Sequence, residues 1–148
     1  MPKKRKESEI VKKRIHNAHK VLMKVFMESP VTKIKFSKNR ISFNYFGYRI
    51  SDRITVKKQP HVGEWSRRVR KIVIDKNFKT KERAKEFRSL CLHEAVERFL
   101  VKKFGLNTDN EAHPVAKKKE KEYLESVGGN WKSHQLKVFW DWHKLGEK

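Results

Sequence analysis

A histidine and a glutamate stand four residues apart in the segment Leu92–Glu97, at His93 and Glu97. On a helix, side chains at this spacing project from one face, one turn apart. Ionisable groups within an apolar stripe are costly to bury unless they pair with one another or bind a metal. The other side chains of this face are apolar and follow helical spacing, namely Leu90, Leu100, Val101 and Phe104.

The next predicted helix repeats this pattern. His113 and Glu120 lie along one side of it, together with Ala116, Leu124 and Val127. Two helices that each turn a histidine and a glutamate toward a shared interior are typical of a metal site. We therefore predict a divalent metal, zinc in the first place, held by His93, Glu97 and His113. Glu120 is either a fourth ligand or an outer partner that orients an imidazole.

These residue types suit metal-assisted hydrolysis. Hydrolytic zinc sites use three protein ligands, one open position and a carboxylate that acts as general base. The short motif H-E-x-x-H supplies two histidine ligands and that glutamate. Here Glu97 takes the last position, so the motif is a degenerate form, and His113 completes a set of two histidines and one carboxylate. Glu94 is then free to accept a proton from bound water and is the candidate catalytic residue.

The arrangement resembles the small zincin-like metallopeptidase fold, in particular its minimal gluzincin-like members. The resemblance rests on Arg70–Asp75 as a strand, Leu92–Glu97 as the active helix and Glu111–Glu120 as the following element. It implies a compact sheet that ends in an edge strand, a third ligand from the following helix, and a zinc-dependent, peptidase-like hydrolase. The chain departs from the family at Glu97, where the family has histidine, and at His113, where it has glutamate.

A structural interpretation of the same residues stays open. His93 and Glu97 would then be an ordinary pair on a partly hydrated helix face, and His113 a histidine at a helix start. The protein would be a non-enzymatic DNA- or RNA-binding protein, or one associated with a ribonucleoprotein. Replacing Glu94 separates these alternatives, because turnover depends on it only in an enzyme.

The chain carries a large excess of positive charge. Its 148 residues include 38 Lys and Arg against 17 Asp and Glu, a formal net charge of +21. Residues 31–83 hold 16 basic and 4 acidic side chains, whereas residues 84–127, which include the predicted ligands, hold 9 and 8. Such a bias concerns partners rather than fold, and phosphate backbones are the first counter-surface to consider. We therefore predict association with DNA or RNA on a second surface.

Aromatic residues are interleaved with these cations and can stack on unpaired bases. Phe43 and Tyr45 have an equally simple role as core side chains. The run Pro2–Lys6 is either a phosphate-seeking arm or, in a eukaryote, a nuclear import signal. No signature of base-specific recognition is present. The predicted nucleic-acid contacts are Lys3, Lys4, Arg5, Lys6, Lys57, Lys58, Arg67, Arg68, Arg70 and Lys71.

The sequence also bears on the compartment. A single cysteine, Cys91, excludes an internal disulfide and fits a reducing interior. No apolar run approaches the roughly 18 residues of a membrane span, and no signal-peptide core is present. We expect a cytoplasmic protein, or a nuclear one in a eukaryote, that has no membrane partner. Abundant Lys, Arg and Glu with few Cys and Met are compatible with a thermophile.

The predicted fold is α+β, with a basic flexible arm over residues 1–7 and a single zincin-like domain over residues 8–148. A helix over residues 8–28 ends before Pro30. A small antiparallel sheet of three or four strands follows, drawn from Val31–Phe36, Arg40–Ile50, Ile54–Lys57 and Arg70–Asp75. Residues 58–69 are expected to form a long loop.

Three helices then complete the predicted fold. The first runs from about Lys81 to Phe104 and ends at Gly105, a normal helix-terminating residue. The second is capped by Thr108 or Asp109 and closes at Gly128-Gly129. The third covers about Trp131–Lys144. The predicted metal ligands lie on the first two of these helices.

Overall fold

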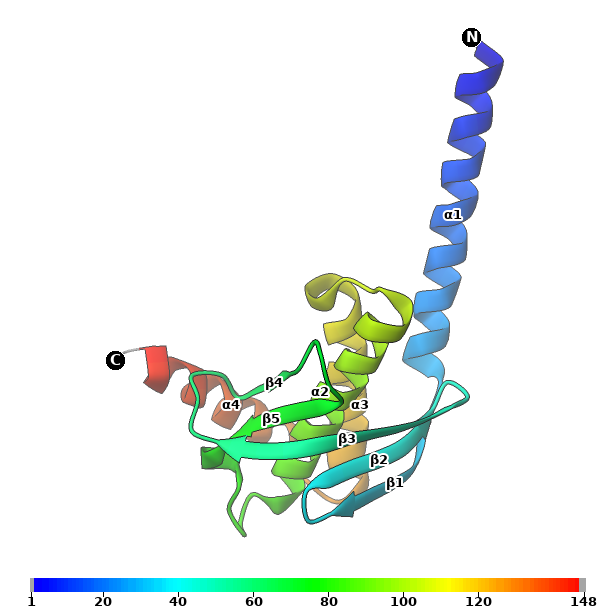
Figure 1. The fold of residues 1–148 in the computed structure, drawn as a ribbon. Coiled ribbons are helices and arrows are strands. Elements are labelled where there is room, and N and C mark those ends of the chain that lie inside the picture. The colour runs from blue at the N-terminus through cyan, green and yellow to red at the C-terminus, as the bar shows by residue number, and fades with distance from the viewer. Residues whose placement is uncertain (1, 147–148) are drawn as a thin grey trace. The chain divides into compact units, whose positions relative to one another are not determined.

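A computed structural model describes residues 2–146, with side chains for residues 8–141. It confirms the α+β class: an N-terminal helix, a small mixed sheet and then three helices (Figure 1). The chain forms two compact units, Met1–Pro30 and Val31–Lys148. The boundary between the two units, after Pro30, lies within the domain predicted over residues 8–148. The physical reason is that residues 8–20 of the first unit are exposed on every side, while the sheet and the later helices share a core.

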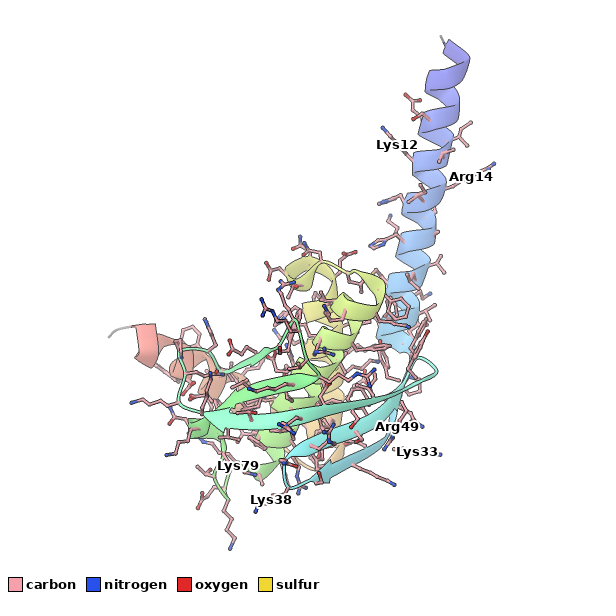
Figure 2. The ribbon with its side chains drawn as sticks, in the orientation of Figure 1. Lys12, Arg14, Lys33, Lys38, Arg49 and Lys79 are labelled. Carbon is pink, nitrogen blue, oxygen red and sulfur yellow. The ribbon has the colours of Figure 1, made fainter. Side chains whose placement is uncertain are left out.

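The first unit is the helix α1 (Pro2–Glu28). It begins at Pro2 and not near Ser8, so the backbone of the predicted flexible arm is helical from its second residue. Proline suits the first helical position because it has no N–H to leave unpaired, and Lys, Arg and Glu are good helix formers. Figure 2 shows Lys12 and Arg14 projecting from α1. The side chains of Lys3, Lys4, Arg5 and Lys6 lie outside the described residues.

The second unit contains a five-stranded sheet in the order β1-β2-β3-β5-β4. Its strands are β1 (Val31–Ser37), β2 (Arg40–Tyr45), β3 (Tyr48–Lys57), β4 (Gly63–Trp65) and β5 (Lys71–Asp75). The prediction of three or four antiparallel strands was wrong in two respects. β5 pairs with β3 in parallel, and β4 lies within the predicted loop. A three-residue strand is too short to show a hydrophobic period.

The alternating stretch Arg40–Ile50 forms two strands joined by a tight turn at Phe46 and Gly47. Both residues have positive φ, 52° and 80°. This pair of values suits the two-residue hairpin turn whose twist matches that of the strands. Glycine adopts it freely, whereas Phe46 is held by its ring, which packs edge-on against Phe104 at 5.4 Å. The turn fixes the register in which Phe43 faces Ile50.

Helices cover one face of the sheet. α2 (Ala84–Phe104) packs across β2, β3, β4 and β5, and α3 (His113–Ser126) packs along α2 (Figure 1). Ile41, Phe43 and Tyr45 alternate toward this layer and are almost fully buried. Cys91 is also buried there, and burial raises the pKa of its thiol. The core therefore lies between the sheet and α2, the helix that carries most of the predicted site.

Short elements set the entry and exit of these helices. A 3₁₀ turn, Lys76–Phe78, follows β5, and Gly105 ends α2 with φ 67°, as predicted. A π-helical turn, Thr108–Ala112, precedes α3. Its cap is Asn107, not Thr108 or Asp109, because the Asn107 side chain accepts a hydrogen bond from the Asn110 amide at 3.0 Å. α4 (Trp131–Gly146) closes the fold. Among the described residues, no helix has the combined length and apolar character that a membrane crossing requires.

Candidate metal centre

Two helices bring three ligand atoms to one point. His93 and Glu97 lie one turn apart on α2, and His113 is the first residue of α3. One ligand atom from each lies within 4.8 Å of the other two. Oε2 of Glu97 is 3.1 Å from Nε2 of His93 and 3.1 Å from Nδ1 of His113. A zinc ion with bonds of about 2.0–2.2 Å can therefore reach all three with small side-chain adjustments.

The sequence brings these groups together for local reasons. Positions 90, 93, 97 and 100 follow the helical repeat, so the apolar residues of that stripe carry His93 and Glu97 into the interior. Gly105 ends α2 and the turn at residues 105–112 reverses the chain, which places the start of α3 beside the middle of α2. His93 and Glu97 are 6% and 7% exposed, whereas the side chain of His113 is 51% exposed. The cluster is therefore buried at His93 and Glu97 and reaches solvent at His113.

The cluster lies in a cavity of about 560 Å³. Residues of β4, α2, α3 and α4 form its walls, and the group includes Trp65, Leu90 and Phe139. A volume of this order accommodates a small-molecule or side-chain ligand. The cavity combines apolar surface with the three candidate ligands, as ligand-binding pockets commonly do.

Trp65 of β4 fixes Glu97 from the sheet side. Its indole Nε1 donates a hydrogen bond to Oε1 of Glu97 at 3.0 Å. The other oxygen of Glu97 is thus the one left for the two imidazoles. Sequence reasoning missed Trp65 because it lies 32 residues before Glu97 in the segment expected to be a loop.

Glu120 stands behind His93. Its Oε1 is 2.7 Å from Nδ1 of His93, and its other oxygen contacts Nε2 of His134. Both oxygens are therefore engaged away from the point where the three candidate ligands meet. Metal-bound histidines usually donate their second ring N–H to such a carboxylate. This geometry favours the outer-partner alternative for Glu120 over the fourth-ligand alternative.

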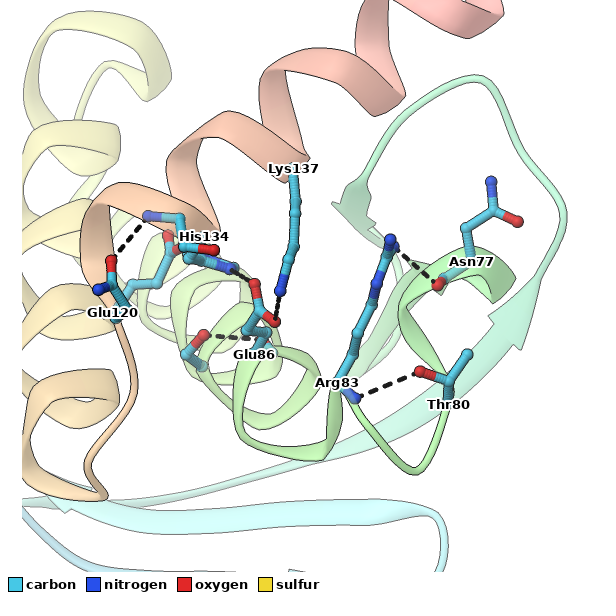
Figure 3. A network of polar contacts seen from close by, with 10 residues as sticks. Asn77, Thr80, Arg83, Glu86, Glu120, His134 and Lys137 are labelled. Carbon is cyan, nitrogen blue, oxygen red and sulfur yellow. Dashed lines mark hydrogen bonds and ion pairs between the residues drawn. The ribbon is translucent and has the colours of Figure 1, made fainter.

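The polar network continues beyond Glu120 into α4 (Figure 3). His134, which is fully buried, places Nδ1 3.0 Å from Oε1 of Glu86. Lys137 donates to Oε2 of Glu86 at 2.7 Å. Sequence reasoning missed His134 and Glu86. The available signal was that Glu86 lies seven residues, two helical turns, before His93 and so shares its face.

The network sets the charge of its members. Burial by itself would raise the pKa of Glu97, but hydrogen bonds from His113 and His93 lower it to about 2. Burial likewise opposes ionisation of Glu120, and contacts with His134 and His93 lower its pKa to about 2. Burial disfavours the charged form of His93, yet its hydrogen bonds to Glu120 and Glu97 dominate and raise the pKa of this imidazole. The site therefore holds two ionised carboxylates, and the raised pKa of His93 makes its protonated ring the cation that they share. A metal ion would take the place of the His93 proton that faces Glu97.

Glu94 has the opposite electrostatic setting. Burial raises its pKa; His93 opposes the increase, Glu97 and Glu120 add to it, and the pKa reaches about 8. The side chain faces the cavity. Its carboxyl group fits there because Gly63 of β4 has no side chain: a Cβ at Gly63 would come within 2.8 Å of Oε1 of Glu94. A carboxyl group with a pKa near neutrality is a suitable proton acceptor and donor.

Comparison with protein-family models, with curated proteins and with solved structures gives no match for this chain. The function must therefore be inferred from the geometry of the site.

The predicted nucleic-acid contacts are mostly on the surface. Lys57, Lys58, Arg67, Arg68 and Arg70 are exposed, and Lys71 is half-buried. The Arg67 guanidinium lies over the Trp65 ring, 5.3 Å from its centre, at the cavity wall. The aromatic residues predicted either to stack on bases or to fill the core do the second: Phe43 is 0% and Tyr45 1% exposed.

Proposed function

We propose that this protein is a metal-dependent hydrolase whose cation, zinc in the first place, is held by His93, Glu97 and His113. The observation that carries the proposal is the convergence of two imidazoles and one carboxylate within 4.8 Å at an open cavity. Two histidines and one carboxylate are a donor set that zinc accepts in hydrolytic sites. When bound there, zinc would supply a Lewis acid and a water that loses its proton near neutral pH.

The other side chains of the site have distinct parts in this proposal. Glu94 accepts a proton inside the cavity, next to His93 in sequence and within the same wall. A nearby divalent cation would lower the pKa of Glu94 from its raised value and so restore its ability to accept one. Glu120 engages Nδ1 of His93 and so leaves Nε2 facing the other candidate ligands. Trp65 holds the carboxylate of Glu97 in place through its hydrogen bond to Oε1. The resemblance to zincin-like proteins makes peptides the first substrate class to examine.

The proposal is tested by metal analysis of the full chain purified without chelator. We expect about one zinc per chain, consistent with a single site. His113→Ala should remove it while leaving the fold intact, because this side chain is half exposed. His61→Ala, an exposed histidine outside the cluster, is the matched control and should keep the metal. Absence of metal from the wild type, or equal content in His113→Ala, would refute the site.

Catalysis requires a second experiment. Glu94→Gln should keep the metal and lower turnover of a fluorogenic peptide panel by about 10²- to 10⁴-fold, the usual effect of a general base. If the cluster is structural, the same substitution changes nothing in the assay.

We also propose that the protein associates with nucleic acid. The supporting observation is the exposure of Lys57, Lys58, Arg67, Arg68 and Arg70, together with the 16 basic and 4 acidic residues of the segment 31–83. Binding of this kind releases counterions, so it should weaken steeply between about 50 and 200 mM salt. Salt-independent binding would contradict the proposal.

A further inference from the structure

The side of β1, β2 and β3 that faces away from the helices carries cations and uncharged polar side chains and no acid. Alternate residues of a strand share a face. In the strand register, positions 35 and 37 of β1 are opposite positions 42 and 40 of β2. Positions 40, 42 and 44 of β2 are opposite positions 53, 51 and 49 of β3, and position 53 is opposite position 71 of β5. The intervening positions, such as Ile41 and Phe43, face the helices and are buried. The basic members of the outward set, called here the basic face, are Lys35, Arg40, Arg49, Arg53, Lys57 and Lys71.

Three of these cations form a row across the strands. Arg40 is directly opposite Arg53, and Arg53 is directly opposite Lys71. Neighbouring strands are about 4.8 Å apart, so the three Cα positions span about 10 Å. Like charges directly opposite each other destabilise a sheet. Asp52, the only acid of β2 and β3, is 1% exposed, and its charge interacts with Arg98, Arg70 and Arg40. Asp75 of β5 is opposite Lys57 and is also 1% exposed, and Glu64 lies beyond the row on the edge strand β4. Neither Arg53 nor Lys71 of the row is directly opposite a carboxylate, so an external polyanion would offset this repulsion.

The remaining side chains of the basic face suit a phosphate backbone. Arg40 donates to Oγ of Ser51 at 3.1 Å, and Arg49 donates to Oδ1 of Asn44 at 3.0 Å, so two guanidinium groups lie along the face. Figure 2 shows Arg49 beside Lys33 at one end of these strands and Lys38 at the other. Serine, threonine and asparagine hydroxyl and amide groups are common partners of phosphate and sugar oxygens.

The composition of the basic face also selects the class of polyanion. An anionic membrane surface is bound by cations accompanied by apolar side chains that enter the lipid. The positions of β1, β2 and β3 between these cations are Ser37, Ser42, Asn44, Ser51 and Thr55, none of them apolar. Binding of unpaired bases uses exposed aromatic rings. Here Phe43 and Tyr45 are on the buried side. A face that contacts phosphates alone favours a duplex, because a duplex has a higher density of phosphate charge than a single strand.

We propose that the basic face binds the backbone of double-stranded nucleic acid without reading its sequence. This assignment rests on the nucleic-acid association proposed above and gives it a location distinct from the metal cavity. The Arg40–Arg53–Lys71 row is the centre of the interface.

The test compares two triple variants of the full chain that lose the same charge. Arg40→Gln/Arg53→Gln/Lys71→Gln removes the row. Lys81→Gln/Lys121→Gln/Lys132→Gln removes three exposed lysines that lie outside the basic face. Binding of a fluorescent 20-base-pair duplex of arbitrary sequence is measured by anisotropy across a salt series. Circular dichroism and thermal unfolding accompany each titration.

We expect the row variant to bind at least about tenfold more weakly, with its salt slope reduced by about 1 for each phosphate that it no longer neutralises. The control variant should change affinity by less than about threefold. The unfolding temperature of the row variant should be no lower than that of the wild type, because a like-charge row is removed. Its metal content should be unchanged.

Each other outcome is informative. A wild type that binds no duplex refutes the nucleic-acid association as well as this interface. A wild type that binds, with both triple variants weakened equally, refutes only the assignment to the basic face. A row variant that loses binding to anionic phosphatidylserine vesicles but not to the duplex shows that the face is a membrane contact and overturns the proposal.

Discussion

Glu120 and His93 meet across the interface of α3 and α2, with 2.7 Å between Oε1 and Nδ1. Because Nδ1 of His93 is engaged by this carboxylate, Nε2 is the ring nitrogen that faces Glu97 at 3.1 Å. Such a contact fixes the tautomer and orientation of a metal-binding imidazole. The second oxygen of Glu120 contacts His134, so α4 is tied to the same group. The candidate site therefore depends on all three helices of the second unit.

Replacing Glu120 should weaken metal binding although Glu120 is not placed as a ligand. Glu120→Gln removes the negative charge behind His93, and loss of such an outer partner typically lowers metal affinity 10- to 100-fold. Zinc affinity is measured by competition with a chromophoric chelator. Glu122→Gln, an exposed glutamate two residues later, is the control. Complete loss of metal in Glu120→Gln would instead indicate that Glu120 is a ligand.

Removing His134 should destabilise the fold. This side chain is 0% exposed and lies between the carboxylates of Glu120 and Glu86. His134→Ala leaves two buried carboxylates without their shared partner, which costs about 3–5 kcal/mol of the free energy of unfolding. Urea denaturation measures this value. Gln135→Ala, at the exposed neighbouring position, should stay within about 0.5 kcal/mol of the wild type. A loss below about 1 kcal/mol in His134→Ala would contradict the network.

Much of the site follows from local sequence, and its remainder does not. The helical repeat that places Leu90 and Leu100 in the core also determines that His93 and Glu97 point inward, so this part was predictable. The pairing of Trp65 with Glu97 was not, because it joins residues 32 positions apart through a strand of three residues. The parallel pairing of β5 with β3 is also a long-range property. Periodicity reports which side of an element is buried, but not which element packs against it.

The raised pKa of Glu94 predicts a pH dependence of stability. The folded chain keeps this proton up to a pKa of about 8, whereas the ordinary value, taken for the unfolded chain, is 4.5. The folded state thus binds more protons between these values. The contribution of Glu94 is full below pH 4.5 and is lost as the pH rises toward 8. Stability should therefore fall over this window in the presence of a chelator.

Glu94→Gln tests this dependence, since glutamine does not titrate. Urea denaturation is compared at pH 5.0 and 6.5. The stabilising contribution of His93, whose pKa is raised from 6.5, is lost only above this range and so does not affect the comparison. The depressed pKa values of Glu97 and Glu120 act at lower pH, between about 2 and 4.5. The fall in the free energy of unfolding should be steeper in the wild type than in Glu94→Gln, which keeps the contribution of Asp75, whose pKa burial raises to about 6. Equal slopes in the two proteins would show that Glu94 ionises normally.

The close approach of Gly63 to Glu94 predicts a coupled pair of substitutions. A Cβ at Gly63 would lie 2.8 Å from Oε1 and 3.0 Å from Cγ of Glu94, so Gly63→Ala must displace the carboxyl group or shift β4. Overpacking of this kind costs about 1–3 kcal/mol. Displacing a catalytic group by about 1 Å can lower turnover about 10²-fold, while His93, Glu97 and His113 keep the metal.

A double-mutant cycle separates this steric effect from a change in backbone freedom. In the Glu94→Ala background the obstructing atoms are absent, so adding Gly63→Ala should cost at least about 1 kcal/mol less than it does in the wild type. Urea denaturation of the four proteins gives the coupling free energy, and zinc content confirms that the ligands stay assembled. Equal costs in the two backgrounds would place the effect in the β4 backbone. The glycine would then have no role in admitting Glu94 to the cavity.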